Sequence, residues 1–529
     1  MLSGLSVIGS ERGSEQQEKL FSFSTLRGAD LPEAFSVASQ AEIDVAIAKA
    51  RLAFPIYAAL PATKRAGFLE AIAAEISAIS ETLVERAHLE SGLPIARLQG
   101  ECGRTVNQLK LFAAVLNEGS YVEAVIDPAL PDRQPLPRAD LRKWLIPLGP
   151  VAVFAASNFP LAFSTAGGDT ASALASGCPV IVKAHQSHLG TNELVAVAIQ
   201  QAAKKTGMPD GVFSSIVGGG ATLGQTLAAH EGIKAVGFTG SYRAGMSIFR
   251  KATFERKTPI PVYAEMSSIN PVLLLPEKIA ADPVALATQM AGSVTLGVGQ
   301  FCTNPGLLFV IKGTATANFE KALSEALLKA PAGTMLNKTI CSAYYNEKEK
   351  LASMQGVELL VDNPSAANEY KGSAALMKVN STQFRENEEF QNEVFGPSTL
   401  LVSCESLEDM VDTIATIHGQ LTGSVFGTEA DFSAFQPAIN ILAERVGRLI
   451  YNAVPTGVEV CYAMVHGGPY PATTDGRSTS VGADAIKRFL RPVCLQDAPA
   501  ALLPDALKNE NPLGIMRKLN GVYTRDVVV

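Results

Sequence analysis

Short apolar strands alternate with helices from residue 151 onward, and this alternation constrains the fold more than any other feature of the sequence. The segments "VAVFAA" and "PVIVKA" are strand-like, and a stretch of helical character follows each of them. Such alternation is typical of a parallel sheet with helices on both faces. A second series of the same kind begins at "NPVLLLP". We therefore expect an α/β fold with two Rossmann-like parallel-sheet domains.

The chain before and after this region has other patterns. Residues 41–60 and 64–90 carry apolar side chains three and four positions apart, which predicts helices. Residues 121–150 hold many prolines and charges among short β-prone pieces. We expect them to form an extended ribbon that protrudes from the body, although their composition suits a surface linker nearly as well. The tail ends in "YTRDVVV", which we expect to be an edge strand.

The composition argues against several classes of protein. The formal net charge of -7 and the lack of a Lys/Arg-rich run give little support for a nucleic-acid partner or a membrane surface. No apolar run reaches the length of about 18 residues that a membrane span needs, and the first residues do not resemble a signal peptide. The seven cysteines are scattered without a CxxC pair, so we expect neither a disulfide framework nor a metal site. These features favour a cytoplasmic enzyme.

Two glycine-rich turns follow predicted strands and open predicted helices. A phosphate can meet free backbone N–H groups at such places. In "GGGATLG", the spacing that includes Gly220 and Gly224 is as often structural as functional. "FTGSYRAG" is the better candidate, because Gly240 and Gly245 bracket the start of a helix and Ser241 adds a hydroxyl. Together the two turns predict a nucleotide cofactor on the first domain.

Cys302 lies in the turn-rich stretch "GQFCTNPG", between a predicted helix and a predicted strand. A thiolate is a strong nucleophile, but a cysteine in a protein interior is more often an inert small residue. The six histidines offer no clear base for this thiol. Glu265, a lone acid at the end of an apolar strand, is either a base with a raised pKa or a satisfied structural carboxylate. The residues alone leave these alternatives open.

Six stretches taken together resemble motifs of the aldehyde dehydrogenase superfamily, in the family's order and over most of the chain. They are "SNFP", "PVIVKAHQS", "FTGSYRAG", "EMSSINP", "GQFCTNPG" and "NEVFGP". The spacing between Glu265 and Cys302 also matches the family's. The resemblance implies an aldehyde dehydrogenase-like fold. It also implies the oxidation of an aldehyde to a carboxylic acid with a nicotinamide cofactor.

The resemblance assigns catalytic roles to individual residues. It implies that Cys302 attacks the aldehyde to form a thiohemiacetal and then a thioester. It implies that Asn158 donates to the oxyanion and that Glu265 activates the water that hydrolyses the thioester. Lys183 is expected to bind ribose hydroxyls of the cofactor, and Glu393 to bind the nicotinamide ribose. The presence of Glu265 favours hydrolysis over transfer of the acyl group to coenzyme A.

The choice of cofactor rests on few residues. NAD-specific relatives often have a glutamate three residues after the lysine, whereas this chain has Gln186, which permits NADP. "GGGATLG" holds no Lys or Arg for a 2′-phosphate, so we expect NADP with NAD as an alternative. Phe301, Thr303 and Phe163 are the expected substrate contacts. The expected cofactor-binding residues are Lys183, Gln186, Gly220, Gly224, Thr239, Gly240, Ser241, Gly245 and Glu393.

Departures from the common family pattern point to a narrower branch. Ser267 and Ser268 replace the usual glycines after the glutamate, and Ser157 replaces a tryptophan. With "HGGPYPATTD" and "RFLRPVC", they resemble 2-oxoglutarate semialdehyde (2,5-dioxopentanoate) dehydrogenases and NADP-linked fatty aldehyde dehydrogenases. We expect the first activity, which gives 2-oxoglutarate. The alternatives are a broad-specificity or fatty aldehyde dehydrogenase, a thiol hydrolase or esterase, and a silent structural relative. The intact catalytic residues argue against the last.

The resemblance also implies how the chain is divided. The expected parts are a cofactor-binding domain of residues 1–120 and 146–266, a catalytic domain of residues 267–460, a return to the first domain at 461–489, and an oligomerisation ribbon and tail at 121–145 and 490–529. The ribbon and tail imply a homodimer or homotetramer.

Overall fold

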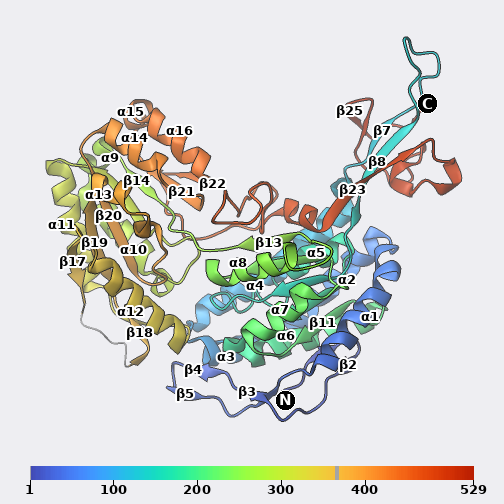
Figure 1. Cartoon of the computed structure of the whole chain (residues 1–529), viewed down its shortest axis with the longest axis horizontal. Helices are drawn as coiled ribbons and strands as arrows, with labels where there is room; N and C mark the ends of the chain where they lie inside the picture. Colours follow the sequence, from blue (N-terminus) through green and yellow to red (C-terminus); the bar gives the residue numbers. More distant parts are fainter. Residues whose placement is uncertain (1, 364–368, 529) are drawn as a thin grey trace.

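The computed structural model describes residues 2–363 and 369–528, so Met1 and Val529, at the ends of two predicted segments, lie outside the described residues. Two lobes lie side by side, and an arm projects from one of them (Figure 1). The first lobe contains a seven-stranded sheet. Its strands in spatial order are β13 (Val262–Glu265), β12 (Ala235–Thr239), β9 (Val151–Phe154), β10 (Val180–Lys183), β11 (Phe213–Ile216), β1 (Val7–Ile8) and β2 (Glu11–Arg12).

Alternate side chains of the central strands bury opposite faces of this first sheet. Val151 and Val153 of β9 point into one core, while Ala152 and Phe154 point into the other. Helices supply both cores, as the alternation of the sequence predicted. The first core is covered by α2 (Ala62–Ala78), α3 (Ser80–Ser91), α4 (Ile95–Glu118), α5 (Gly168–Ser176) and α6 (Leu189–Thr206). The second is covered by α1 (Gln40–Ala58), α7 (Gly220–Ala229) and α8 (Tyr242–Thr253).

The order of the strands creates a place for a ligand. β9, β10 and β11 run outward in one direction, and the chain then crosses to lay β12 and β13 on the other side of β9, all in parallel. In open α/β sheets, ligands bind beyond the carboxyl ends of the strands at such a switch point. The loops after β9, β10, β12 and β13 therefore meet at one edge.

The second lobe repeats the architecture with a second seven-stranded sheet. Its strands in spatial order are β17 (Glu358–Asp362), β19 (Ala375–Asn380), β20 (Ser398–Cys404), β15 (Leu307–Ile311), β14 (Val272–Leu274), β21 (Gln420–Phe426) and β22 (Val446–Tyr451). All pairs are parallel except β17 with β19. One face is covered by α9 (Pro276–Ala281), α10 (Pro283–Thr295) and α11 (Thr314–Lys329), and the other by α13 (Ser381–Glu386), α14 (Leu407–Ala415) and α16 (Gln436–Arg445).

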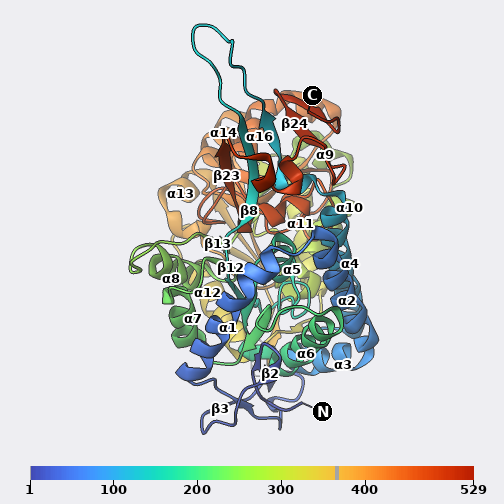
Figure 2. The same cartoon turned by 90° about the vertical axis from the view of Figure 1, so that its right-hand side faces the viewer.

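A five-stranded sheet forms the base of the projecting arm (Figures 1 and 2). Its strands in spatial order are β23 (Leu490–Gln496), β8 (Leu141–Pro147), β7 (Val125–Asp127), β24 (Arg517–Leu519) and β25 (Val522–Thr524). The arm therefore joins residues of the proline-rich stretch to residues of the C-terminal tail. The predicted fold class, two parallel-sheet lobes with a small protruding β element, is confirmed.

Local details differ from the sequence patterns. The helical pattern of residues 64–90 belongs to two helices, α2 and α3, because the helix breaks at Ile79. Short strands near the N-terminus, which the sequence did not predict, include β1 and β2 at the edge of the first sheet. Among the described residues, no helix combines the length and the apolar character that crossing a bilayer requires.

A buried ion pair attaches a late segment of the chain to the first lobe. Arg488, in the 3-10 helix η6 (Ala483–Phe489), donates from Nη2 to Oδ1 of Asp169 over 2.7 Å, and both side chains are largely inaccessible. Burial raises the pKa of Asp169, and the guanidinium opposes that rise. Removal of one partner from such a pair leaves an uncompensated charge in the interior.

We predict that Arg488→Met lowers the free energy of unfolding by about 3 kcal/mol at pH 7. The loss should shrink as the pH falls toward 5, because without Arg488 the pKa of Asp169 rises further and the carboxyl is neutralised by protonation. Urea unfolding followed by circular dichroism measures both effects. Lys487→Met is the matched control, since Lys487 forms half-exposed pairs with Glu123 and Asp484. An equal loss in both variants at pH 7 would contradict the role given to the buried pair.

Candidate active site

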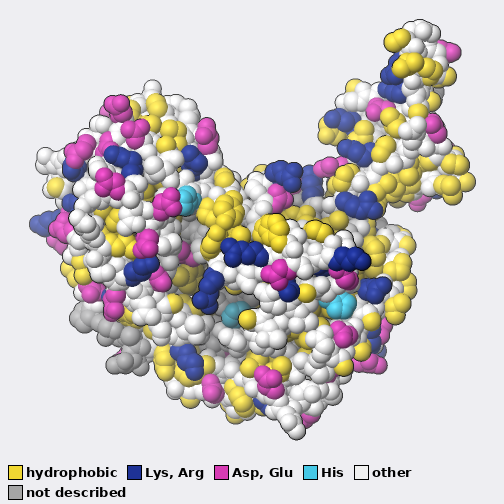
Figure 3. All heavy atoms as spheres, viewed as in Figure 1, with side chains coloured by type: hydrophobic (Ala, Val, Ile, Leu, Met, Phe, Trp, Pro, Cys, Tyr) yellow, Lys and Arg dark blue, Asp and Glu magenta, His cyan; other side chains and the backbone are white. Residues whose placement is uncertain are grey.

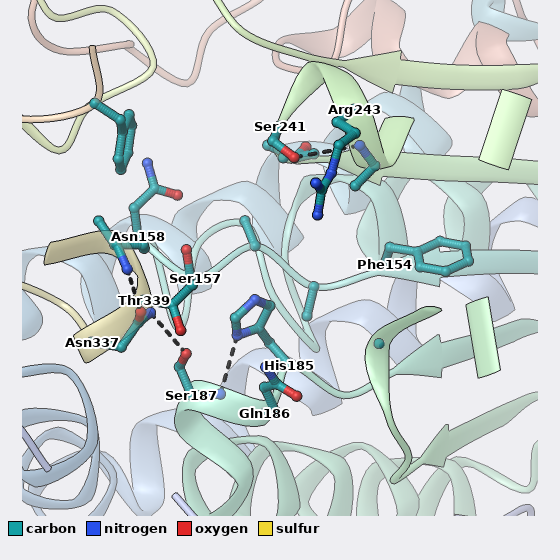
Figure 4. Close-up of a pocket in the computed structure, with 18 of the residues that line it drawn as sticks. Phe154, Ser157, Asn158, His185, Gln186, Ser187, Ser241, Arg243, Asn337 and Thr339 are labelled. Atoms are coloured by element: carbon teal, nitrogen blue, oxygen red, sulfur yellow. Dashed lines mark hydrogen bonds between the residues drawn. The ribbon is translucent and has the colours of Figure 1, made fainter. Parts of the chain in front are cut away.

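A cavity of about 840 Å³ opens where the loops of the first sheet face the second lobe. It lies at the carboxyl ends of β9, β10, β12 and β13, as expected for a switch point. Figure 4 shows the loop after β9, the residues after β10 and the start of α8 surrounding the open space. Most of the predicted site residues line it, namely Asn158, Lys183, Gln186, Gly220, Gly224, Thr239, Gly240, Ser241, Glu265, Cys302 and Glu393.

The loop that carries Cys302 is fixed by two buried amide side chains. Nδ2 of Asn270 donates to the backbone carbonyls of Cys302, over 2.8 Å, and Asn304, over 2.9 Å. Nδ2 of Asn158 donates to the carbonyl of Gln300 over 3.2 Å, so Asn158 lies against the same loop. One of its two amide hydrogens is used in this bond, and the other is available to a bound group. The thiol is thus held at the junction of the lobes.

His466 lies against Cys302, although the sequence pointed to none of the six histidines as a clear partner for this thiol. Nε2 of His466 is 3.5 Å from Sγ of Cys302 and 2.9 Å from Oε1 of Glu265. The three ligand atoms all lie within 4.8 Å of one another. His466 and Glu265 are fully buried, whereas Cys302 is half-buried and reaches the cavity. Sulfur, imidazole and carboxylate therefore form one acid–base unit.

The segment that holds His466 follows the outer edge of β13. Glu265 forms an isolated antiparallel bridge with Thr473, and the N–H of Met266 donates to the carbonyl of Ala472 over 2.8 Å. The hydroxyl of Ser480 donates to Oε2 of Glu265 over 2.8 Å. Both carboxylate oxygens of Glu265 consequently have partners from the same late segment.

These partners decide the charge of Glu265. Burial alone raises the pKa of this carboxyl, but the charge and hydrogen bond of His466 and the hydroxyl of Ser480 outweigh it and hold the pKa below its ordinary value. The alternative of a base with a raised pKa, which the sequence left open, is therefore wrong. Glu265 is ionised at neutral pH despite its position in the interior.

Cys302 has the opposite shift. Burial raises the pKa of the thiol well above its ordinary value, and the negative charge of Glu265 raises it further. The resting group is thus a thiol rather than a thiolate, since the charged form is disfavoured both by desolvation and by repulsion. A proton acceptor must act when the sulfur attacks, and the ionised carboxylate of Glu265 lies within hydrogen-bonding reach of the thiol.

The remainder of the cavity fits a dinucleotide. The first turn of α7 has no side-chain cap, so its N–H groups are free for phosphate oxygens, while Ser241 caps α8 through the N–H of Ala244. Burial lowers the pKa of Lys183 to about 8. Burial also raises the pKa of Glu393, half-buried on the opposite wall, to about 7. Cationic, acidic and backbone N–H groups are thus spread along one cleft, as a cofactor with phosphates and riboses requires.

Four predicted residues do not line this cavity. Gly245 is buried within α8, where a Cβ would come within 2.7 Å of Sδ of Met266, so close packing explains the glycine. Thr303 is almost fully buried beside the thiol. Phe301 and Phe163 both lie against Phe159, with ring centroids 5.4 and 5.3 Å away. The two phenylalanines thus form an aromatic wall next to the loop of Asn158.

The sequence did not identify His466, Ser480 or Arg243. The first two lie about 200 positions from Glu265, so no local spacing connects them. The only available signal was that His466 opens "HGGPYPATTD". Arg243 lies inside "FTGSYRAG", a stretch that was interpreted only through its glycines and its serine. Figure 4 shows its side chain pointing from the start of α8 toward His185 and Gln186.

We predict that alkylation of Cys302 by iodoacetamide is slow at pH 7.5 and rises about tenfold per pH unit through pH 9. Glu265→Gln should react faster than the wild type at pH 8, because loss of the carboxylate charge lowers the pKa of the thiol. Glu393→Gln removes a weaker repulsion and should give a smaller increase. Mass spectrometry of the Cys302 peptide provides the rate, and Cys302→Ser gives the background. Slower alkylation of Glu265→Gln at every pH would contradict this electrostatic account.

Comparisons with known proteins agree on the family. Residues 28–491 match the aldehyde dehydrogenase family. The chain is 52% identical to an alpha-ketoglutaric semialdehyde dehydrogenase 2 of Azospirillum brasilense, over 98% of this chain and 99% of the relative. It is 44% identical to an alpha-ketoglutaric semialdehyde dehydrogenase of Acinetobacter baylyi, over 93% of each chain.

Solved structures share the fold at low sequence identity. Aldehyde dehydrogenase 21 of Physcomitrella patens, solved with the reaction product succinate, has a TM-score of 0.78 and 21% identity, with 94% of this chain and 99% of that chain covered. A betaine aldehyde dehydrogenase of Staphylococcus aureus solved with NAD+ has a TM-score of 0.78 and 19% identity, with 94% and 98% covered. The family match over residues 28–491 and the 52% and 44% identities over nearly the whole length show that this chain belongs to the aldehyde dehydrogenase family.

Proposed function

We propose that this enzyme oxidises 2-oxoglutarate semialdehyde to 2-oxoglutarate, with NADP as the preferred cofactor and NAD as an alternative. The contact of Cys302 with His466 and Glu265 at the end of a dinucleotide-sized cleft carries the catalytic part of the proposal. The names of the two most similar relatives described here support the substrate. Overall, aldehyde, oxidised cofactor and water give carboxylate, reduced cofactor and protons.

The first step forms a bond between Sγ of Cys302 and the aldehyde carbon. The ionised carboxylate of Glu265 accepts the thiol proton, because Nε2 of His466 already donates its hydrogen to Oε1 of Glu265 and has no free lone pair. That proton leaves through the cavity that Glu265 lines, so the carboxylate is ionised again for the hydrolysis step. The aldehyde oxygen becomes an oxyanion, for which the second amide hydrogen of Asn158 is the side-chain donor.

When bound, a nicotinamide cofactor would accept the hydride that the thiohemiacetal on Cys302 loses as it becomes a thioester. Lys183 and Glu393, on opposite walls of the cleft, are the residues we assign to the riboses of the cofactor. Glu265 is the base for the final step. Because its pKa is lowered, it is ionised and takes a proton from the water that attacks the thioester. The acid leaves, and Cys302 is regenerated.

The test is the absorbance of reduced nicotinamide with 2-oxoglutarate semialdehyde and NADP or NAD. We expect turnover with stoichiometric formation of 2-oxoglutarate, and no turnover in Cys302→Ala although that variant still binds the cofactor. Retention of near-normal turnover by Cys302→Ala would refute the nucleophile. A wild-type enzyme that reduces neither cofactor with this or several other aldehydes would refute the proposed function.

The preference for NADP rests on the charges near the adenosine end of the cleft. Gln186, unlike an acid, does not repel a 2′-phosphate. Arg243 is exposed and forms no ion pair within the part of the chain that the structure describes. A guanidinium can bind a phosphate through two parallel hydrogen bonds. Arg243 thus supplies the cation that the turn before α7 lacks.

We predict that Arg243→Gln weakens NADP binding about tenfold and NAD binding by less than threefold, because only NADP carries the 2′-phosphate. Titration calorimetry of the free enzyme measures both affinities without turnover. Lys251→Gln, on the same helix but paired with Glu255, is the control and should leave both unchanged. Equal weakening of both cofactors by Arg243→Gln would contradict a role at the 2′-phosphate.

We further propose a homodimer or homotetramer built through the arm, in a reducing compartment such as the cytoplasm. Hydrophobic side chains gather on the surface of the arm in Figure 3. The exposed apolar residues of this region include Leu130, Leu136, Leu513, Val522 and Tyr523. Exposed apolar area of this kind marks sites of association. All seven cysteines are free, which suits such a compartment.

A further inference from the structure

One face of α4 presents three charged side chains to the loop that holds Asn158. Arg97, Glu101 and Arg104 are four and three positions apart, so they lie along the same side of the helix. Oε1 of Glu101 accepts from the N–H groups of Leu161, over 2.8 Å, and Ala162, over 3.0 Å. Glu101 therefore fastens the helix to the loop, and an arginine lies on either side of this attachment.

Arg104 lies one aromatic ring away from His466. Its guanidinium carbon is 4.9 Å from the ring centroid of Phe163, and that ring is 6.0 Å from the ring of His466. His466 in turn contacts the sulfur of Cys302. Arg104, Phe163 and His466 do not line the nucleotide cavity, whereas Cys302 does. Arg104 therefore approaches the nucleophile from a different side than the cofactor.

The guanidinium of Arg104 has an unused edge. Its Nε and Nη2 are both buried, and neither has a hydrogen-bond partner in the part of the chain that the structure describes. Within the described part of the chain, Arg104 also makes no ion pair, not even with neighbouring Glu101. Nε and Nη2 form one side of the planar guanidinium and present two parallel N–H bonds. That arrangement matches the two oxygens of a carboxylate.

The other arginines near the thiol are engaged in holding the protein together. Arg97 stacks on Phe159 and Phe301, and its Nη2 donates to the carbonyl of Asn158 over 2.8 Å. Arg448 donates from Nη2 to the carbonyls of Pro455 and Gly457, over 3.0 and 2.9 Å. Among these three, Arg104 is the cation with a complete bidentate edge free.

We propose that Arg104 is the specificity residue that binds the carboxylate of an acidic aldehyde and so places the aldehyde carbon at Cys302. This inference rests on the proposed function, since it assigns a residue to the acid end of that substrate. The aromatic wall of Phe159, Phe163 and Phe301 would pack against the carbon chain between the two ends. The negative charge of such a substrate also compensates a guanidinium whose burial lowers its pKa.

The test uses two aldehydes that differ by one charge, 5-oxopentanoate and its methyl ester. The wild-type enzyme should have a much lower KM for the acid. Arg104→Gln should raise the KM for the acid about 10²-fold, while kcat for the acid and both constants for the ester change by less than threefold. Arg104→Lys should recover part of the loss, because it restores the charge but not the paired geometry.

Arg448→Gln is the matched control, because it removes another partly buried positive charge that interacts electrostatically with the same thiol. If long-range charge alone selects the acid, both glutamine variants will raise the KM for the acid equally, and the proposal fails. It also fails if Arg104→Gln keeps the wild-type preference for the acid, an outcome that leaves the proposed function intact. A wild-type enzyme that oxidises neither aldehyde nor 2-oxoglutarate semialdehyde would instead refute the proposed function. Unchanged turnover of the ester by Arg104→Gln shows that the variant is folded.

Discussion

The burial of the Glu265 carboxylate next to the Cys302 thiol is the constraint on which the active site depends. A lone carboxylate in this position would take up a proton, because desolvation disfavours its charge. His466 and Ser480 bind one oxygen each and keep it ionised. The same charge keeps the neighbouring sulfur protonated until a substrate arrives. The same arrangement therefore keeps the base, Glu265, ionised and the nucleophile, Cys302, protonated.

The architecture of the two lobes could be predicted from the sequence because it depends on local patterns of residues. β-prone apolar runs, helical spacing and glycine turns each depend on a few neighbouring residues, and together they gave the parallel sheets and the cleft at their carboxyl ends. Residues at the ends of strands, such as Lys183, Thr239 and Glu265, could be placed at the cleft for the same reason. The roles of Asn158 and Cys302 needed the family resemblance, since the turn-rich setting of Cys302 alone left open whether it is a nucleophile or an inert residue.

The missed residues all depend on contacts that local patterns do not encode. His466 reaches Glu265 because residues after Gly467 run beside β13, and that pairing is decided by tertiary structure. The pKa of Glu265 went the opposite way from the expectation for a buried acid, because its partners come from that same segment. Arg104 belongs to an otherwise ordinary amphipathic helix, and only the position of Phe163 reveals what its guanidinium faces.

The order in which the parts of the site occur along the chain has a consequence for biosynthesis. Asn158, Glu265 and Cys302 leave the ribosome before His466 and Ser480, and Arg488 follows them. A nascent chain that has completed both large sheets still lacks the two partners that keep Glu265 ionised and the buried cation for Asp169. The charge state of Glu265 is thus tied to completion of nearly the whole polypeptide. A prematurely terminated chain would therefore carry a protonated Glu265 and would lack the ionised base that hydrolyses the thioester.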